Sequence, residues 1–200
     1  TEMGYKVKPG DVVKYDGATV KPEKKVYVLL NKPKDFAVSK VDYLDKKSVY
    51  SLIKKATRDQ MAMIDPIDKV SKGLVLFTND HDLLNKFHSP TIKVHQVLQI
   101  TLNKAFEQEH VKVMTETGVL INKSRVTVEK LSILTNKGDN EIGVEFRAQK
   151  HKSIYNSLEK LGYQVLKVDR VGFASLTKKD LPRGVFRHLT EKEVAFLKML

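Results

Sequence analysis

Alternating apolar and polar stretches along the chain predict a mixture of strands and helices. Two continuous apolar runs, at 26–30 and 74–77, indicate strands that are buried on both faces. Between them, the segment 61–68 is interrupted by Asp65-Pro66, and we predict a loop there. Further strands are predicted at 97–102, 119–121, 126–134, 142–146 and 163–168.

Helices are predicted where a capping residue precedes an apolar stripe. Within 152–161, Ile154, Leu158 and Leu161 are spaced to share one face, and Gly162 follows the last turn. The other predicted helices begin after Ser48, after Asn79 or Asp80, at Phe106, and after the capping box of Thr190 and Glu193.

The first residues form a pattern of their own, in which Asp16-Gly17 separates two short strand-like runs. An Asp-Gly pair in this setting is a strong signal for a β-hairpin. The charged segment 21–25 then predicts a linker, so we place a domain boundary between 1–22 and 23–200. In the larger part, strands and helices do not alternate strictly, which favours the α+β fold class.

Composition excludes several classes of protein. The 200 residues are 41% hydrophobic, which is enough for a packed core. The chain has no cysteine, which excludes a disulfide scaffold and any Cys-ligated metal. His81, His88 and His95 are evenly spaced, but Ser89-Pro90 ends the helix between them, so we expect no metal site. No apolar run could cross a bilayer and no signal peptide is seen, so we expect no membrane partner. The absence of cysteine fits a reducing cytoplasm, and a monomer is the default expectation.

Charge adds a first indication of a partner. Lys and Arg number 36 against 24 Asp and Glu, which gives a formal net charge of +12. Such an excess favours a polyanion, because phosphates that bind protein cations release condensed counterions. A solvated lysine-rich surface would give the same count, so charge alone leaves both interpretations open.

Asp68 lies on the predicted loop just before the second buried strand. A side chain in such a place is held by a rigid element yet open to its surroundings, as a catalytic nucleophile or base must be. An aspartate that only caps a turn is the common alternative.

The segment 65–80 resembles the signature loop of the ribosomal-RNA pseudouridine synthases, in the branch that carries an N-terminal α-L RNA-binding module. That loop contains Gly-Arg-Leu-Asp, then Ser or Thr, Gly-Leu-Leu and Thr-Asn-Asp. Asp68 falls on the family's catalytic aspartate, and Gly73-Leu74 and Thr78-Asn79-Asp80 match in register. The segments that resemble the rest of the family domain are 30–33, 161–163, 165–171, 176–184 and 187–190.

The resemblance implies a pseudouridine synthase-like catalytic domain at 23–200, with a central mixed, mostly antiparallel sheet flanked by helices. Residues 1–22 would be the remnant, the last hairpin, of an α-L type module. The implied reaction is the isomerisation of uridine to pseudouridine in ribosomal RNA, without cofactor or metal. Asp68 would attack the ribose or remove a proton from it, after the target base is flipped from its RNA context.

Several positions depart from the family pattern, among them Asn156, which replaces a second Arg. Pro66 replaces an Arg of the loop, Leu98 replaces a Tyr that packs on the base, and Tyr155 replaces an Arg that pairs with the aspartate. We expect Leu98, Ile154 and Tyr155 to line the uracil pocket. The cations that could compensate for the missing arginine are Lys69, Lys150, Lys152 and Arg170.

Two functions therefore remain open from the sequence. The first is an active pseudouridine synthase, and the second is a catalytically inactive RNA-binding or ribosome-assembly paralogue on the same fold. Both predict RNA as the partner and basic residues as phosphate contacts. The candidates are Lys32, Lys72, Lys150, His151, Lys152, Arg170, Arg183 and Arg187.

Overall fold

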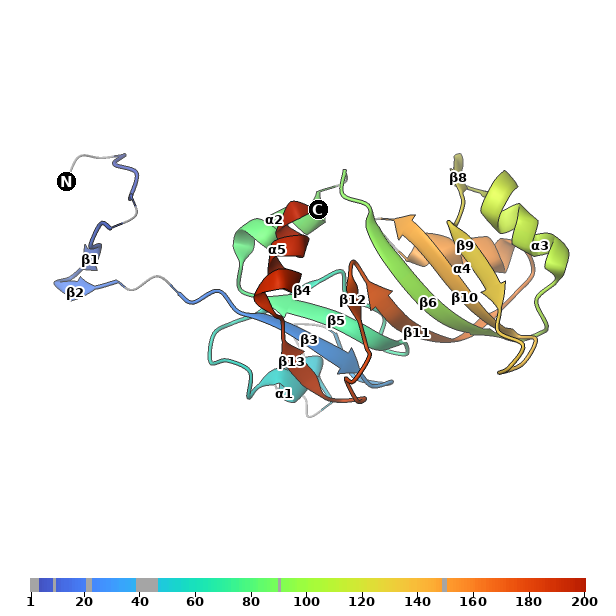
Figure 1. Ribbon diagram of the computed structural model, residues 1–200, viewed down its shortest axis with the longest axis horizontal. Coiled ribbons are helices and arrows are strands. Elements are labelled where there is room, and N and C mark those ends of the chain that lie inside the picture. Colours follow the sequence, from blue (N-terminus) through green and yellow to red (C-terminus); the bar gives the residue numbers. More distant parts are fainter. Residues whose placement is uncertain (1–3, 9, 21–22, 39–46, 90, 149–150) are drawn as a thin grey trace.

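The computed structural model describes residues 4–8, 10–20, 23–38, 47–89, 91–148 and 151–200, and it centres on one large sheet (Figure 1). The path through this 9-stranded sheet is β13-β3-β5-β11-β6-β10-β9, with β4 paired to β5 and β12 paired to β11. Its strands are β3 (Tyr27–Lys32), β4 (Ala62–Ile64), β5 (Lys72–Thr78), β6 (Val94–Leu102), β9 (Lys130–Ile133), β10 (Glu141–Ala148), β11 (Val165–Phe173), β12 (Leu176–Thr177) and β13 (Phe186–His188).

The direction of the strands confirms the predicted fold class. Strands β11 and β5 are parallel, whereas the other pairs of this sheet are antiparallel. The parallel contact is central, because it joins the half of the sheet formed by β3 and β5 to the half formed by β6 and β10. The molecule is therefore α+β, with a mixed and mostly antiparallel sheet.

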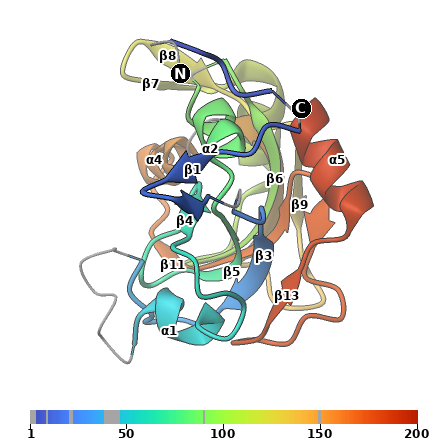
Figure 2. The same cartoon turned by 90° about the vertical axis from the view of Figure 1, so that its left-hand side faces the viewer.

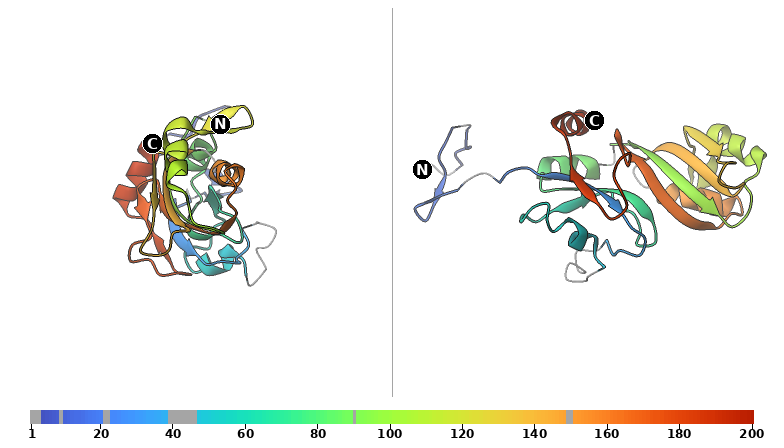
Figure 3. Two further views of the ribbon diagram at one scale, coloured as in Figure 1. Left: turned by 90° about the vertical axis from the view of Figure 1, so that its right-hand side faces the viewer. Right: turned by 60° about the horizontal axis from the view of Figure 1, so that its bottom comes forward.

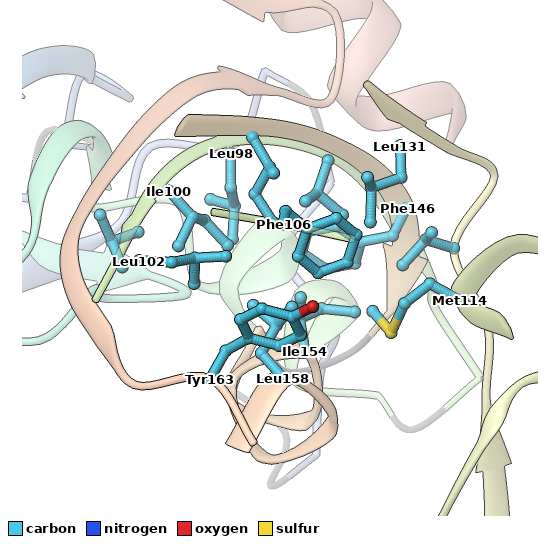
Figure 4. Packing of buried hydrophobic residues seen from close by; sticks show 14 of the residues in the cluster. Leu98, Ile100, Leu102, Phe106, Met114, Leu131, Phe146, Ile154, Leu158 and Tyr163 are labelled. Atoms are coloured by element: carbon cyan, nitrogen blue, oxygen red, sulfur yellow. The ribbon is translucent and has the colours of Figure 1, made fainter. Parts of the chain in front are cut away.

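The helices pack against the sheet through three apolar clusters. Figure 2 shows α1, α2, α4 and α5 arranged around the strands. Helix α4 (Lys152–Lys160) packs on β6 and β10, and Figure 4 shows Ile154 and Leu158 beneath Leu98 and Ile100. Helices α2 (His81–His88) and α5 (Glu191–Met199) share a second cluster, and α1 (Val49–Ile53) belongs to a third. Helix α3 (Gln108–Lys112) runs into the π-helical turn η2 (Val113–Thr117).

The predicted N-terminal hairpin is confirmed. Strands β1 (Lys14–Tyr15) and β2 (Ala18–Thr19) pair across Asp16 and Gly17, whose φ angles of 46° and 75° are those of a type I′ turn. The hairpin stands away from the large sheet in every view that shows it side-on (Figures 1 and 3). Its assignment to an α-L type module, and the boundary at residue 22, stay predictions.

Two predicted elements differ from the structure. The segment 61–68 contains β4, because its residues pair with β5, and only the part after Ile64 is a loop. The predicted strand 126–134 is two strands, since β8 (Ser124–Val126) turns back on β7 (Val119–Ile121) while β9 joins β10. Among the described residues, no helix is both long enough and apolar enough to cross a membrane.

Candidate active site

The loop that carries Asp68 is fixed from below by a buried lysine. Lys32 is completely buried, and its Nζ donates to the carbonyl oxygens of Pro33, Asp68, Lys69 and Ser71 at 3.2, 3.2, 2.8 and 2.6 Å. These bonds replace the water that the ammonium group loses on burial. Burial lowers the pKa of Lys32 to about 8, and the ammonium group therefore stays mainly charged at neutral pH. Lys32 thus holds the backbone of the loop.

Asp65 forms a second anchor of the same loop, through a buried arginine. Arg170 on β11 has no exposed surface, and its guanidinium donates to Asp65 Oδ2 and to the Asp65 carbonyl oxygen, both at 2.8 Å. Its Nε donates to the Leu74 carbonyl at 2.8 Å, and Gln96 Nε2 donates to Asp65 Oδ2 at 2.9 Å. Because the arginine is satisfied by this set of acceptors, it is not free to pair with Asp68.

Gly73 lets the loop approach β11 so closely. A Cβ atom at this position would lie 2.3 Å from the carbonyl oxygen of Arg170, and the backbone φ of Gly73 is +112°. Both facts exclude a larger residue without a shift of the strand. The glycine therefore keeps β5 and β11 in the register that brings Arg170 to Asp65.

Asp68 itself is open to solvent. Its side chain is 40% exposed, with Lys152 Nζ 3.8 Å from Oδ1 and His151 Nε2 3.9 Å from Oδ2. Among the residues that the structure describes, no lysine or arginine nitrogen comes within hydrogen-bond distance of this carboxylate. The acid is thus presented on a rigid loop, with positive charge close by but not bound to it.

The start of helix α4 forms the wall next to Asp68. His151 is buried, and the Tyr155 ring lies one turn further on, with the two ring centroids 5.4 Å apart. Burial raises the pKa of Tyr155, partly offset by the Ser71 hydroxyl. The phenol is therefore neutral, and it adds an aromatic surface rather than the charge that an arginine would bring.

The structure corrects part of the predicted uracil pocket. Leu98 and Ile154 have no exposed surface, because both belong to the apolar cluster between the sheet and helix α4 (Figure 4). Neither side chain can offer a face to a base in this arrangement. Tyr155, which is only partly buried, remains a candidate for that contact.

Several predicted phosphate contacts are also corrected. Lys32 and Arg170 are buried with their donors occupied, and the His151 ring is buried as well. Arg187 makes two hydrogen bonds to Glu193, of 2.9 and 2.7 Å, in the capping box of helix α5. Lys150 lies outside the described residues. The candidates that remain are Lys72, Lys152 and Arg183, whose contacts with Asp169 or Asp68 are longer, at 3.6 to 4.0 Å.

Lys72 and Arg183 belong to a cluster that the sequence did not reveal. Lys178, Lys72 and Arg183 lie 2.7, 3.6 and 4.0 Å from the same oxygen, Asp169 Oδ2. Asp169 is only 6% exposed, and one carboxylate cannot neutralise three cations. The cluster therefore carries an excess of positive charge at fixed positions.

The described residues hold no group of three metal-ligating side chains.

Asp65 and Gln96 were missed because their partners are distant in the sequence. Arg170 follows Asp65 by 105 positions. One signal was available: Asp65 stands where the resembling loop has glycine, and its φ of 45° is in the left-handed region. An acid at such a position indicates a partner elsewhere in the chain.

Comparisons with known proteins point to one family. The sequence pattern described as RNA pseudouridylate synthase matches residues 26–168. The ribosomal large subunit pseudouridine synthase B of Bacillus subtilis is 26% identical over 100% of this chain and 82% of its own length. An uncharacterised RNA pseudouridine synthase of Aquifex aeolicus is 30% identical over 98% of this chain and 81% of its own.

A solved structure shows the same fold. The crystal structure of a pseudouridylate synthase superimposes with a TM-score of 0.74 at 20% sequence identity, over 96% of this chain and 83% of that one. The family pattern covers most of the chain, from the start of the large sheet to β11, and includes Asp68. This protein therefore belongs to the RNA pseudouridylate synthase family.

Proposed function

We propose that this protein isomerises uridine to pseudouridine in ribosomal RNA, with Asp68 as the reacting carboxylate. The observation that carries the proposal is the contrast between the two acids of the loop. Asp65 is bound by Arg170, whereas Asp68 is 40% exposed and free of such bonds. The backbone of Asp68 is fixed by hydrogen bonds, but its carboxylate makes none with the described residues, so the carboxylate is positioned and still available to a substrate.

The surroundings of Asp68 support this role. Lys32 binds the carbonyl oxygens of Asp68, Lys69 and Ser71, so the position of Asp68 is set before RNA binds. Lys152 Nζ lies 3.8 Å from one oxygen of Asp68 and supplies a positive charge, and the His151 ring lies 3.9 Å from the other oxygen. Lys152 is 67% exposed, so its attraction is weak in water and grows when RNA excludes solvent.

RNA is held, in this proposal, by cations outside the reacting centre. The cluster of Lys72, Lys178 and Arg183 on Asp169 suits a backbone phosphate, because several donors converge on one place. Lys72 follows Asp68 by four positions in the sequence, which limits their Cα separation to roughly 14 Å. A single RNA strand can span that length between the reacting nucleotide and the cluster.

We infer further that the hairpin of residues 1–22 belongs to an α-L type RNA-binding module. The hairpin exposes Val12 and Tyr15, which supports contact with a further element or with RNA. A monomer acting on ribosomal RNA in the cytoplasm is the simplest form of the proposal.

The proposed function is tested by mapping pseudouridine in ribosomal RNA from cells that have or lack the gene. We expect at least one site to lose pseudouridine in the deletion strain, and to regain it with the wild-type gene but not with Asp68→Asn. An unchanged map in the deletion strain would contradict the proposal and would favour an RNA-binding paralogue without activity.

A further inference from the structure

His151 is a buried imidazole between two carboxylates. Its side chain is 6% exposed, with Nδ1 3.9 Å from Asp65 Oδ1 and Nε2 3.9 Å from Asp68 Oδ2. Neither ring nitrogen has a hydrogen-bond partner within the described part of the chain. Buried polar atoms are nearly always satisfied, so such a ring requires an explanation.

The two neighbouring acids differ in what holds them. Asp65 is fixed by Arg170 and Gln96, whereas the side chain of Asp68 is 40% exposed. Asp65, His151 and Asp68 therefore follow one another as an orienting acid, an imidazole and a reacting side chain do in catalytic triads. Distances between such groups are often long without substrate and shorten when substrate excludes water.

The proposed reaction itself requires a proton carrier. When uridine becomes pseudouridine, the C1′–N1 bond breaks and a C1′–C5 bond forms. C5 then loses its hydrogen and N1 gains one, so one proton must move between two atoms of the same base. Imidazole is the side chain best suited to accept and return a proton near neutral pH.

We propose that His151 is a positioning residue that stores this proton, acting through Asp68. In this relay, which rests on the proposed function, Asp68 Oδ2 takes the proton from C5 and passes it to His151 Nε2. The carboxylate of Asp65 stabilises the imidazolium at Nδ1. The proton then returns through Asp68 to N1. The atoms balance, and no oxidant, reductant or further reactant is needed.

The charges around His151 suit a group that begins neutral. Burial lowers the pKa of His151 most strongly, and the positive charges of Arg170 and Lys152 lower it further. Asp65 and Asp68 raise it, so they stabilise the proton once it arrives. The adjacent Tyr155 is neutral and leaves this balance unchanged. The ring is therefore free to accept a proton at pH 7 and loses that capacity in acid.

The relay is tested with His151→Asn and His151→Gln in single-turnover isomerisation of ribosomal RNA. We expect the rate to fall by about 10²- to 10⁴-fold, the usual contribution of general acid–base catalysis. RNA carrying deuterium at C5 of uridine should then react more slowly than normal RNA, because removal of the C5 proton has become limiting. The exposed His88→Asn is the matched control and should keep the wild-type rate.

The wild-type protein gives a second measurement that needs no variant. Its deuterium isotope effect should grow as pH falls through the pKa of His151. A wild-type rate in the folded His151 variants, or an isotope effect that does not change with pH, would overturn the relay. Failure of the proposed function looks different: wild-type protein then makes no pseudouridine at any pH, and the relay fails with it.

Discussion

Replacing Asp65 by Asn should destabilise the protein far more than the same change at Asp68. Arg170 is completely buried, and Asp65 supplies the only carboxylate bound to it among the described residues. With Asn at this position, the guanidinium keeps its charge but loses the anion that offsets its burial. The left-handed φ of 45° at Asp65 suits Asn as well, so the substitution adds no backbone strain.

The magnitude follows from the burial of the pair. Breaking a buried ion pair by removing one partner costs about 3–5 kcal/mol, because an uncompensated charge remains. For a domain of this size, each kcal/mol lowers the midpoint of thermal unfolding by about 2–4 °C, so the expected loss is roughly 6–20 °C. Asp68 makes no bond of this kind, and Asp68→Asn should change the free energy of unfolding by less than about 0.5 kcal/mol.

Thermal and urea unfolding of the two variants, followed by circular dichroism, measure this difference. The two substitutions are chemically identical and lie three positions apart in one loop, so each controls for the other. Equal stability of Asp65→Asn and wild-type protein would refute the reasoning, because Arg170 would then not depend on the carboxylate.

Three further predictions concern other parts of the molecule. Gly73→Ala should lower the free energy of unfolding by about 3 kcal/mol or more in urea titration, because the new methyl group would overlap backbone of β11. Burial alone would raise the pKa of Asp80, but hydrogen bonds from Lys25 and Tyr27 hold this pKa at about 2. Stability should therefore decline as pH falls from about 4 towards 2, and Asp80→Asn should remove that part of the decline. Lys178→Gln should weaken RNA binding. It should also reduce the steepness of the plot of log K against log salt concentration by about 0.7, the contribution of one phosphate contact on a single strand. An unchanged slope would show that Lys178 meets no phosphate.

Local signals were enough for many elements of the fold. The Asp16-Gly17 turn and the cap at Ser48 lie where the sequence predicts them, because each depends on residues next to one another. The capping box of Thr190 and Glu193 is confirmed for the same reason. Strand β4 was missed because three residues are too few to show an alternation of apolar and polar positions. They form a strand because they pair with β5.

The site was predictable only where it follows the spacing of the family loop. That spacing placed Asp68 before β5, and the structure has it there. The pocket around it was not predictable, because burial of Leu98 depends on how helix α4 packs across the sheet. The role of Arg170 was mistaken, since nothing in the local sequence pairs it with Asp65.

In the proposed mechanism the two acids of the loop have different roles: Asp65 stabilises the fold by binding Arg170, and Asp68 reacts with the substrate. Nucleoside analysis of in-vitro transcribed ribosomal RNA, after incubation with purified wild-type protein or Asp68→Asn, measures the second role directly. We expect pseudouridine with the wild-type protein and none with the variant, while the variant melts and binds RNA as the wild type does. Pseudouridine formed at a comparable rate by Asp68→Asn would contradict the account.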